Sequence, residues 1–134
     1  MGVDDKDYQQ VVASAADALD LFVPGIKAAI RELEEKHGPL TPNLLRAFAI
    51  FQREGGEVAD AVLDLSKMAA AHQAKIIVIP GEVLESATQH LGHEIAQCIA
   101  VLTYMLINLF GDRIESSQES GAPIVLVPEN DKVN

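Results

Sequence analysis

The residues of this sequence that could do chemistry are glutamates set among apolar side chains. Over the segment 42–71, a helical wheel of about 100° per residue places Glu54 in the middle of an apolar stripe and Glu57 at its edge. The stripe consists of Leu44, Ala47, Ile50, Phe51, Val58, Ala61, Val62, Leu65 and Met68.

The segment 82–110 repeats this arrangement around Glu94. Its neighbours on the wheel are apolar, whereas Gln97 lies on a polar stripe beside His90. We therefore expect Glu54 and Glu94 to point into the interior from two different helices. The apolar neighbours of Glu94 are Val83, Ala87, Cys98, Val101 and Met105.

Two inward-facing glutamates are energetically unfavourable without a partner. Burial of an unpaired carboxylate costs several kcal/mol, and two such groups repel each other. A divalent cation between them removes both costs. Oxygen ligands without cysteine favour a hard ion, so the sequence predicts a site for Mg²⁺ or Mn²⁺.

Other interpretations of the same residues stay open. A Glu-x-x-Glu motif on a helix is commonly just a solvated face. Glu54 could pair with Arg53 or Arg46 in a buried ion pair instead of binding a metal. His90 and Glu94 have the i, i+4 spacing of a metal pair, although a partly buried histidine more often serves structure. A di-iron site is disfavoured, because it needs Glu-x-x-His motifs that these glutamates do not form.

Long helices must position these groups. The sequence predicts a first helix over 8–22 that breaks or bends at Pro24 and resumes over 26–36. The second should start with Thr41 as N-cap and Pro42 at the first helical position, and end near Ala71. The paired glycines 55–56 inside it lower helix propensity, which suggests a close contact at that point.

The third helix is predicted over 82–110, closed by Gly111, and is followed by a polar, turn-rich segment over 112–122. Two short β-branched runs, 76–79 and 124–127, each end in proline and break the helical period. They are expected to pair as a two-stranded ribbon, within one chain or between subunits, unless the second run is a disordered tail.

The bulk composition narrows the class of protein. Hydrophobic residues make up 49% of the 134 residues and aromatic residues only 4%, which suits one aliphatic helical domain. The net charge of −10 disfavours binding to duplex nucleic acid. The single cysteine excludes an internal disulfide framework. No signal-peptide pattern is evident, and the longest apolar run, 95–110, is short for a membrane span, so we expect a cytoplasmic protein without membrane insertion.

Two stretches carry a resemblance to a known family. Residues 53–62, Arg-Glu-Gly-Gly-Glu-Val-Ala-Asp-Ala-Val, resemble the first signature of MazG-like all-α nucleoside triphosphate pyrophosphohydrolases, a Glu-x-x-Glu before a small apolar run. Residues 93–99, His-Glu-Ile-Ala-Gln-Cys-Ile, resemble the second, a Glu-x-x-Asp on a later helix, and 108–112 are similar to the end of that helix. The resemblance covers about residues 41–114.

The resemblance implies a fold and an activity. It implies an all-α helical bundle completed by oligomerisation as a homodimer or homotetramer, with a MazG-like domain over 1–114 and a polar linker and C-terminal arm over 115–134. It implies metal-dependent cleavage of a nucleoside triphosphate to monophosphate and pyrophosphate. The implied metal ligands are Glu54, Glu57, Glu94 and Gln97, with Glu54 and Glu57 also assigned to catalysis.

Gln97 departs from the family pattern, which has Asp at that position. A neutral amide offers one carbonyl oxygen and should weaken metal binding. The chain is therefore expected to be a weak enzyme, a variant that uses another carboxylate such as Asp60, or a non-catalytic helical oligomer of the same fold that binds nucleotides or a protein partner.

Overall fold

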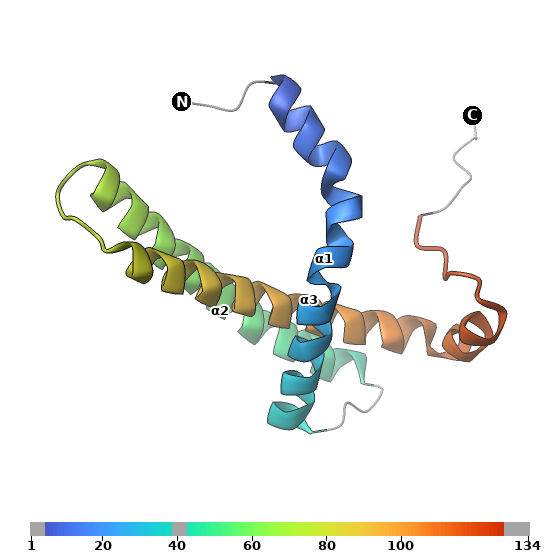
Figure 1. Cartoon of the computed structure of the whole chain (residues 1–134). Coiled ribbons are helices and arrows are strands. Elements are labelled where there is room, and N and C mark those ends of the chain that lie inside the picture. The colour runs from blue at the N-terminus through green and yellow to red at the C-terminus, as the bar shows by residue number, and fades with distance from the viewer. Residues whose placement is uncertain (1–4, 39–42, 128–134) are drawn as a thin grey trace, which may run out of the picture.

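The protein is all-α, as the sequence predicts. The computed structural model describes residues 5–38 and 43–127, and side chains from Ser14 onward within them. It contains α1 (Asp5–His37), α2 (Leu44–Gln73) and α3 (Gly81–Ser120). The helices α2 and α3 form an antiparallel pair, which α1 crosses at a steep angle (Figure 1). This crossing brings α1 close to the middle of α3.

Helix α1 runs through Pro24 without a break. The predicted break is therefore wrong, while the predicted bend is seen as a change in the direction of α1 near its middle (Figure 1). Proline removes one backbone hydrogen bond, the one to the carbonyl of Asp20. Both residues are exposed, so water can satisfy that carbonyl and the helix continues.

Helix α2 begins two residues later than the predicted start, at Leu44 instead of Pro42. Its N-cap is Asn43, whose side-chain oxygen accepts a hydrogen bond from the backbone N–H of Arg46 at 3.0 Å. Asparagine is among the best N-cap residues because its short side chain reaches a free amide of the first turn. The predicted cap residues Thr41 and Pro42 lie outside the described residues.

Helix α3 does not end at Phe110. That residue has non-helical backbone angles (φ −117°, ψ 19°), and the helix kinks there and continues to Ser120. The predicted polar turn-rich segment over 112–122 is thus mostly helical, and the predicted domain boundary after residue 114 falls inside α3. The left-handed residue that closes the helix is Gly121 (φ 76°), whose N–H donates to the Ser117 carbonyl at 2.9 Å.

The predicted ribbon does not form within the chain. Residues 76–79 belong to the connection between α2 and α3, and 124–127 are extended without strand pairing. Lys75 takes a left-handed conformation (φ 60°), and His72 Nδ1 accepts from the Ile79 N–H at 3.4 Å, so the first run serves as a helix–helix turn. Pairing of 124–127 between subunits stays a prediction.

The core lies where α1 crosses the α2–α3 pair. Its fully or nearly fully buried apolar residues come from all three helices: Ala29, Leu33, Ile50, Ala100 and Val101. Helix α3 is also long and apolar enough, by length and composition alone, to cross a membrane, since an 18-residue window within it has a mean hydropathy of 1.5. A core helix of a soluble protein passes the same test.

Candidate metal centre

Three glutamates predicted from the sequence meet between α2 and α3. One carboxylate oxygen each of Glu54, Glu57 and Glu94 lies within 4.8 Å of one oxygen from each of the other two. Glu54 and Glu57 stand one turn apart on α2, and Glu94 faces them from α3. The antiparallel packing of these helices therefore joins residues that are 40 positions apart in the chain.

Glu54 is the most deeply buried of the three. Its exposed fraction is 0%, in agreement with its place in the apolar stripe of α2. One oxygen, Oε1, lies 3.4 Å from Nζ of Lys36 at the end of α1. The other, Oε2, is buried and has no hydrogen-bond partner among the described residues. A buried carboxylate oxygen without a partner is unusual in a native protein, and a water molecule, a proton or a cation would satisfy it.

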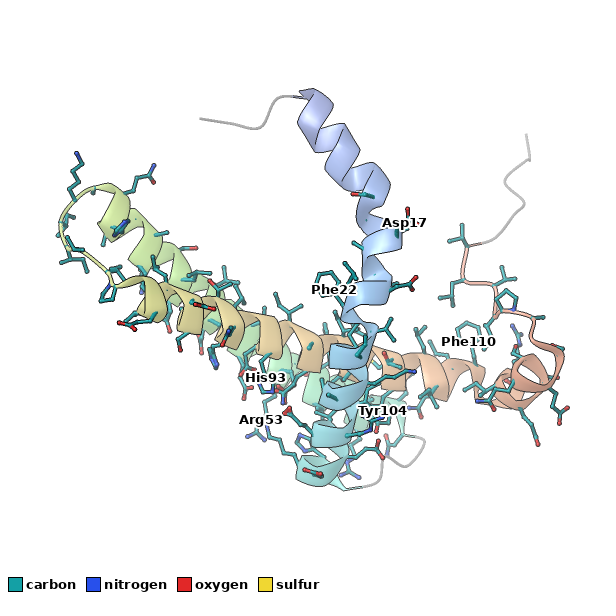
Figure 2. All side chains as sticks on the ribbon, in the orientation of Figure 1. Asp17, Phe22, Arg53, His93, Tyr104 and Phe110 are labelled. Carbon is teal, nitrogen blue, oxygen red and sulfur yellow. The ribbon has the colours of Figure 1, made fainter. Side chains whose placement is uncertain are left out.

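Glu57 lies at the open side of the cluster. Its side chain is 38% exposed, and Oε1 is 4.0 Å from Nε of Arg53. A hydrogen bond with Glu94 lowers the pKa of the Glu57 carboxyl, and partial burial opposes that change. Arg53 lies near the C-terminal end of α1, where its charge acts on His37 (Figure 2).

Glu94 is buried on α3, with an exposed fraction of 8%. Burial raises the pKa of its carboxyl, and the hydrogen bond and negative charge of Glu57 raise it further. Its Oε1 lies 3.8 Å from Nε2 of His90, while Oε2 is buried and has no partner in the described part of the chain. A cation at this position would offset the repulsion between the carboxylates of Glu94 and Glu57.

Gln97 is also buried, with 7% of its surface exposed, one turn beyond Glu94. Its Nε2 lies 3.5 Å from Nε2 of His93, and this histidine nitrogen lies 2.8 and 2.9 Å from the two carboxylate oxygens of Glu32 on α1. His93 must donate to Glu32, because a carboxylate only accepts. His93 thus ties α1 to α3 next to the predicted fourth ligand.

The structure also distinguishes between the alternative metal ligands and the alternative basic partners of Glu54 that the sequence left open. Asp60 is exposed and does not belong to the carboxylate cluster. The alternative pairing of Glu54 with Arg53 or Arg46 is not formed: the basic partner of Glu54 is Lys36, and Arg46 Nη2 donates to the His37 carbonyl at 2.8 Å. The sequence does not single out Lys36 as the partner of Glu54. A lysine in the last turn of a helix is common, because it stabilises the helix end.

The donor set fits a hard divalent cation. Three carboxylates supply oxygen ligands within 4.8 Å of one another, and Glu54 and Glu94 each also have a buried oxygen without a hydrogen-bond partner among the described residues. Mg²⁺ binds oxygen at about 2.1 Å, so oxygens that share one ion stand at most about 4.2 Å apart. Small side-chain rotations would bring the cluster within that range.

The chain matches no protein-family model, no curated protein and no solved structure. The resemblance to MazG-like enzymes thus rests on the two glutamate motifs and their helical setting.

Proposed function

We propose that Glu54, Glu57 and Glu94 bind Mg²⁺ or Mn²⁺ and that the protein is a metal-dependent nucleotide pyrophosphohydrolase. The reaction cleaves a nucleoside triphosphate between the α- and β-phosphates and yields a monophosphate and pyrophosphate. The observation that carries the proposal is the cluster of three carboxylates within 4.8 Å, two of which have a buried oxygen without a partner among residues 5–38 and 43–127. Such a site is costly in the absence of a cation.

The three carboxylates differ in ways that suit different roles. Glu54 and Glu94 are buried and held in place by the two helices, so they suit metal binding. Glu57 is half-buried at the open side and can reach both the ion and a water molecule, which suits a general base. The cation, when bound, supplies charge neutralisation for the triphosphate and orients the attacking water. A local cation also explains how a chain with a net charge of −10 could hold a polyphosphate.

Gln97 is included as the fourth ligand through its carbonyl oxygen. It is neutral, so the site would carry less negative charge than one with four carboxylates, and we expect weak metal affinity and slow turnover. The proposal also includes a cytoplasmic location, where nucleoside triphosphates occur, without membrane insertion. The absence of membrane insertion is supported by Glu94 and Gln97 in the apolar stretch of α3, because burial of polar side chains in a bilayer is energetically unfavourable.

One observation favours a second candidate, a non-catalytic helical oligomer of the same fold that binds nucleotides or a protein partner. The ammonium group of Lys36 lies 3.4 Å from Glu54 and supplies positive charge at the position where a cation would act. A lysine in this role would make the metal unnecessary for folding.

Magnesium-dependent hydrolysis of a panel of nucleoside triphosphates separates the two candidates. Chromatographic detection of monophosphate and pyrophosphate should show turnover with Mg²⁺ that chelation abolishes. Glu54→Gln should remove both turnover and calorimetric metal binding, whereas Glu85→Gln on the exposed side of α3 should change neither. Metal binding without turnover would leave the non-catalytic candidate, and unchanged metal binding in Glu54→Gln would reject the metal site itself.

A further inference from the structure

An apolar groove lies between α1 and α3, next to the point where the two helices cross. Its volume is about 690 Å³, and its walls come from residues 19–26 of α1 and 92–99 of α3. Of its ten lining residues, His93 is the one that is neither apolar nor glycine. Sites for small organic ligands typically have volumes of roughly 300–1,000 Å³ and mainly apolar walls. The groove therefore has the size and the lining of a small-molecule site.

The α1 wall of the groove continues a helix face that is already buried in the core. Ala29 and Leu33 on this face are 2% and 0% exposed. Ile26, Phe22 and Leu19 follow on the same face at spacings of three or four residues, and Phe22 and Leu19 are 62% and 53% exposed. The face loses its cover because the N-terminal half of α1 leads away from the α2–α3 pair (Figure 1). An apolar molecule in the groove would extend the core along this face.

The α3 wall is also aliphatic and incompletely covered. Ala96 packs against the core, whereas Ile95 and Ile99 keep exposed fractions of 42% and 36% although α1 lies beside them. Phe22 lies on α1 just beyond the crossing, above His93 of α3 (Figure 2). Each wall thus leaves apolar surface facing the groove.

Two helical glycines keep the groove open, one on each wall. Gly25 lines it from α1 and Gly92 from α3. A Cβ added to either would meet nothing within 4 Å, so no close approach of the two helices requires a glycine there. Glycine inside a helix is less favourable than alanine, and what these two provide is room in the groove. A Cβ at Gly55 or Gly56 also meets nothing within 4 Å, so the close contact that the sequence predicts there is not formed within the described residues.

The charge and the size of the groove restrict its occupant. Its ionisable residue, His93, is bound through Nε2 to the carboxylate of Glu32 at 2.8 Å, which leaves no unpaired positive charge in the lining for an anionic head group. The net charge of −10 also repels an anion. A stable protein–protein interface uses about 20–30 residues from each side, more than the ten of this groove. These properties favour a small, uncharged, apolar molecule over a protein partner.

We propose that the groove binds a neutral apolar small molecule of the medium-chain alcohol class. The aliphatic chain lies between Phe22 and Ile99, and the hydroxyl at the His93 end donates to the Glu32 carboxylate, which still has free lone pairs. This binding is independent of the metal centre and of any catalysis.

Fluorescence titration of the full chain with N-phenyl-1-naphthylamine, an uncharged apolar probe, tests the site. The wild type should bind one probe molecule per chain saturably, and decanol should displace it. Gly92→Leu, which fills the groove, should weaken probe binding by about tenfold or more. Gly56→Leu, the same substitution at an exposed position of α2, should stay within about twofold of the wild type, because both changes raise helix propensity equally.

The head group gives a second, independent comparison. Decanoate has the same chain length as decanol but carries a negative charge, so it should displace the probe about tenfold less well from the wild type. Glu32→Gln removes the repelling charge and should narrow this difference.

Three results would overturn the proposal. The first is a wild-type chain that binds no probe saturably, including one that excludes the probe because a second copy covers the groove. The second is a Gly92→Leu variant that binds the probe as tightly as the wild type, since the probe would then sit elsewhere. The third is displacement by decanoate as strong as by decanol. The comparison of the two displacing molecules uses the wild type and decides the matter even where a variant does not fold.

Discussion

Lys36 Nζ lies 3.4 Å from Glu54 Oε1, and this contact joins the last turn of α1 to the most buried carboxylate of α2. The two side chains differ greatly in burial, at 39% and 0% exposed. Lys36 thus neutralises a buried charge from the solvent side and competes with any cation for the same carboxylate.

Lys36→Met is expected to have opposite effects on folding and on metal binding. Loss of the ammonium group leaves Glu54 without its basic partner, which should lower the stability of the metal-free protein by about 1–3 kcal/mol. It also removes a competing positive charge, so affinity for Mg²⁺ should rise. Urea unfolding and calorimetric titration measure the two quantities. Lys67→Met, an equal change in charge at an exposed site of α2, should alter neither the stability nor the affinity for Mg²⁺. If Lys36→Met lost both stability and metal affinity, Lys36 would not compete with the cation for Glu54.

Gln97→Asp should strengthen the metal site. The substitution adds a fourth carboxylate beside Glu94, which should destabilise the metal-free protein through repulsion and raise affinity for Mg²⁺ and any pyrophosphohydrolase activity. The thermal shift produced by saturating Mg²⁺ should therefore grow. Gln89→Asp, on the exposed surface of the same helix, is the control. A smaller shift than in the wild type would mean that the site depends on the amide of Gln97 itself.

Tyr104 should titrate far above an ordinary tyrosine. Burial, the negative charge of Glu34 and a hydrogen bond with that carboxyl raise its pKa to about 12. Because the folded state holds the phenol proton more tightly, this tyrosine contributes stability that is present below about pH 10 and lost as pH rises through 12. Ultraviolet titration of a Tyr8→Phe variant should show the high midpoint, and Glu34→Gln should lower it. A midpoint near 10 while the circular dichroism is still native would show that the phenol is not buried.

The apolar segment 124–127 offers a separate test of assembly. Three of its residues, Val125, Leu126 and Val127, are 58–80% exposed in the single chain. If this segment pairs between subunits, removal of residues 122–134, which retains the Gly121 cap, should lower both the thermal midpoint and the association constant. Removal of 128–134 alone is the control. Unchanged stability and assembly after the longer deletion would mean that the segment forms no pairing.

Sequence by itself determined the helical class and the orientation of the key carboxylates. Glu54 and Glu94 are buried as the wheels predict, because helical periodicity is local and an apolar stripe must face the interior whatever it packs against.

Only the tertiary structure decided which groups surround those carboxylates. The contacts of Lys36 with Glu54 and of Glu32 with His93 join residues 18 and 61 positions apart, and they depend on how α1 crosses the pair. The continuation of α3 beyond Phe110 and the absence of pairing within the chain at 124–127 likewise differ from what the local pattern predicts. Local propensity describes single segments, whereas the contacts around the carboxylates depend on how the three helices cross, so no sequence pattern within one segment specifies them.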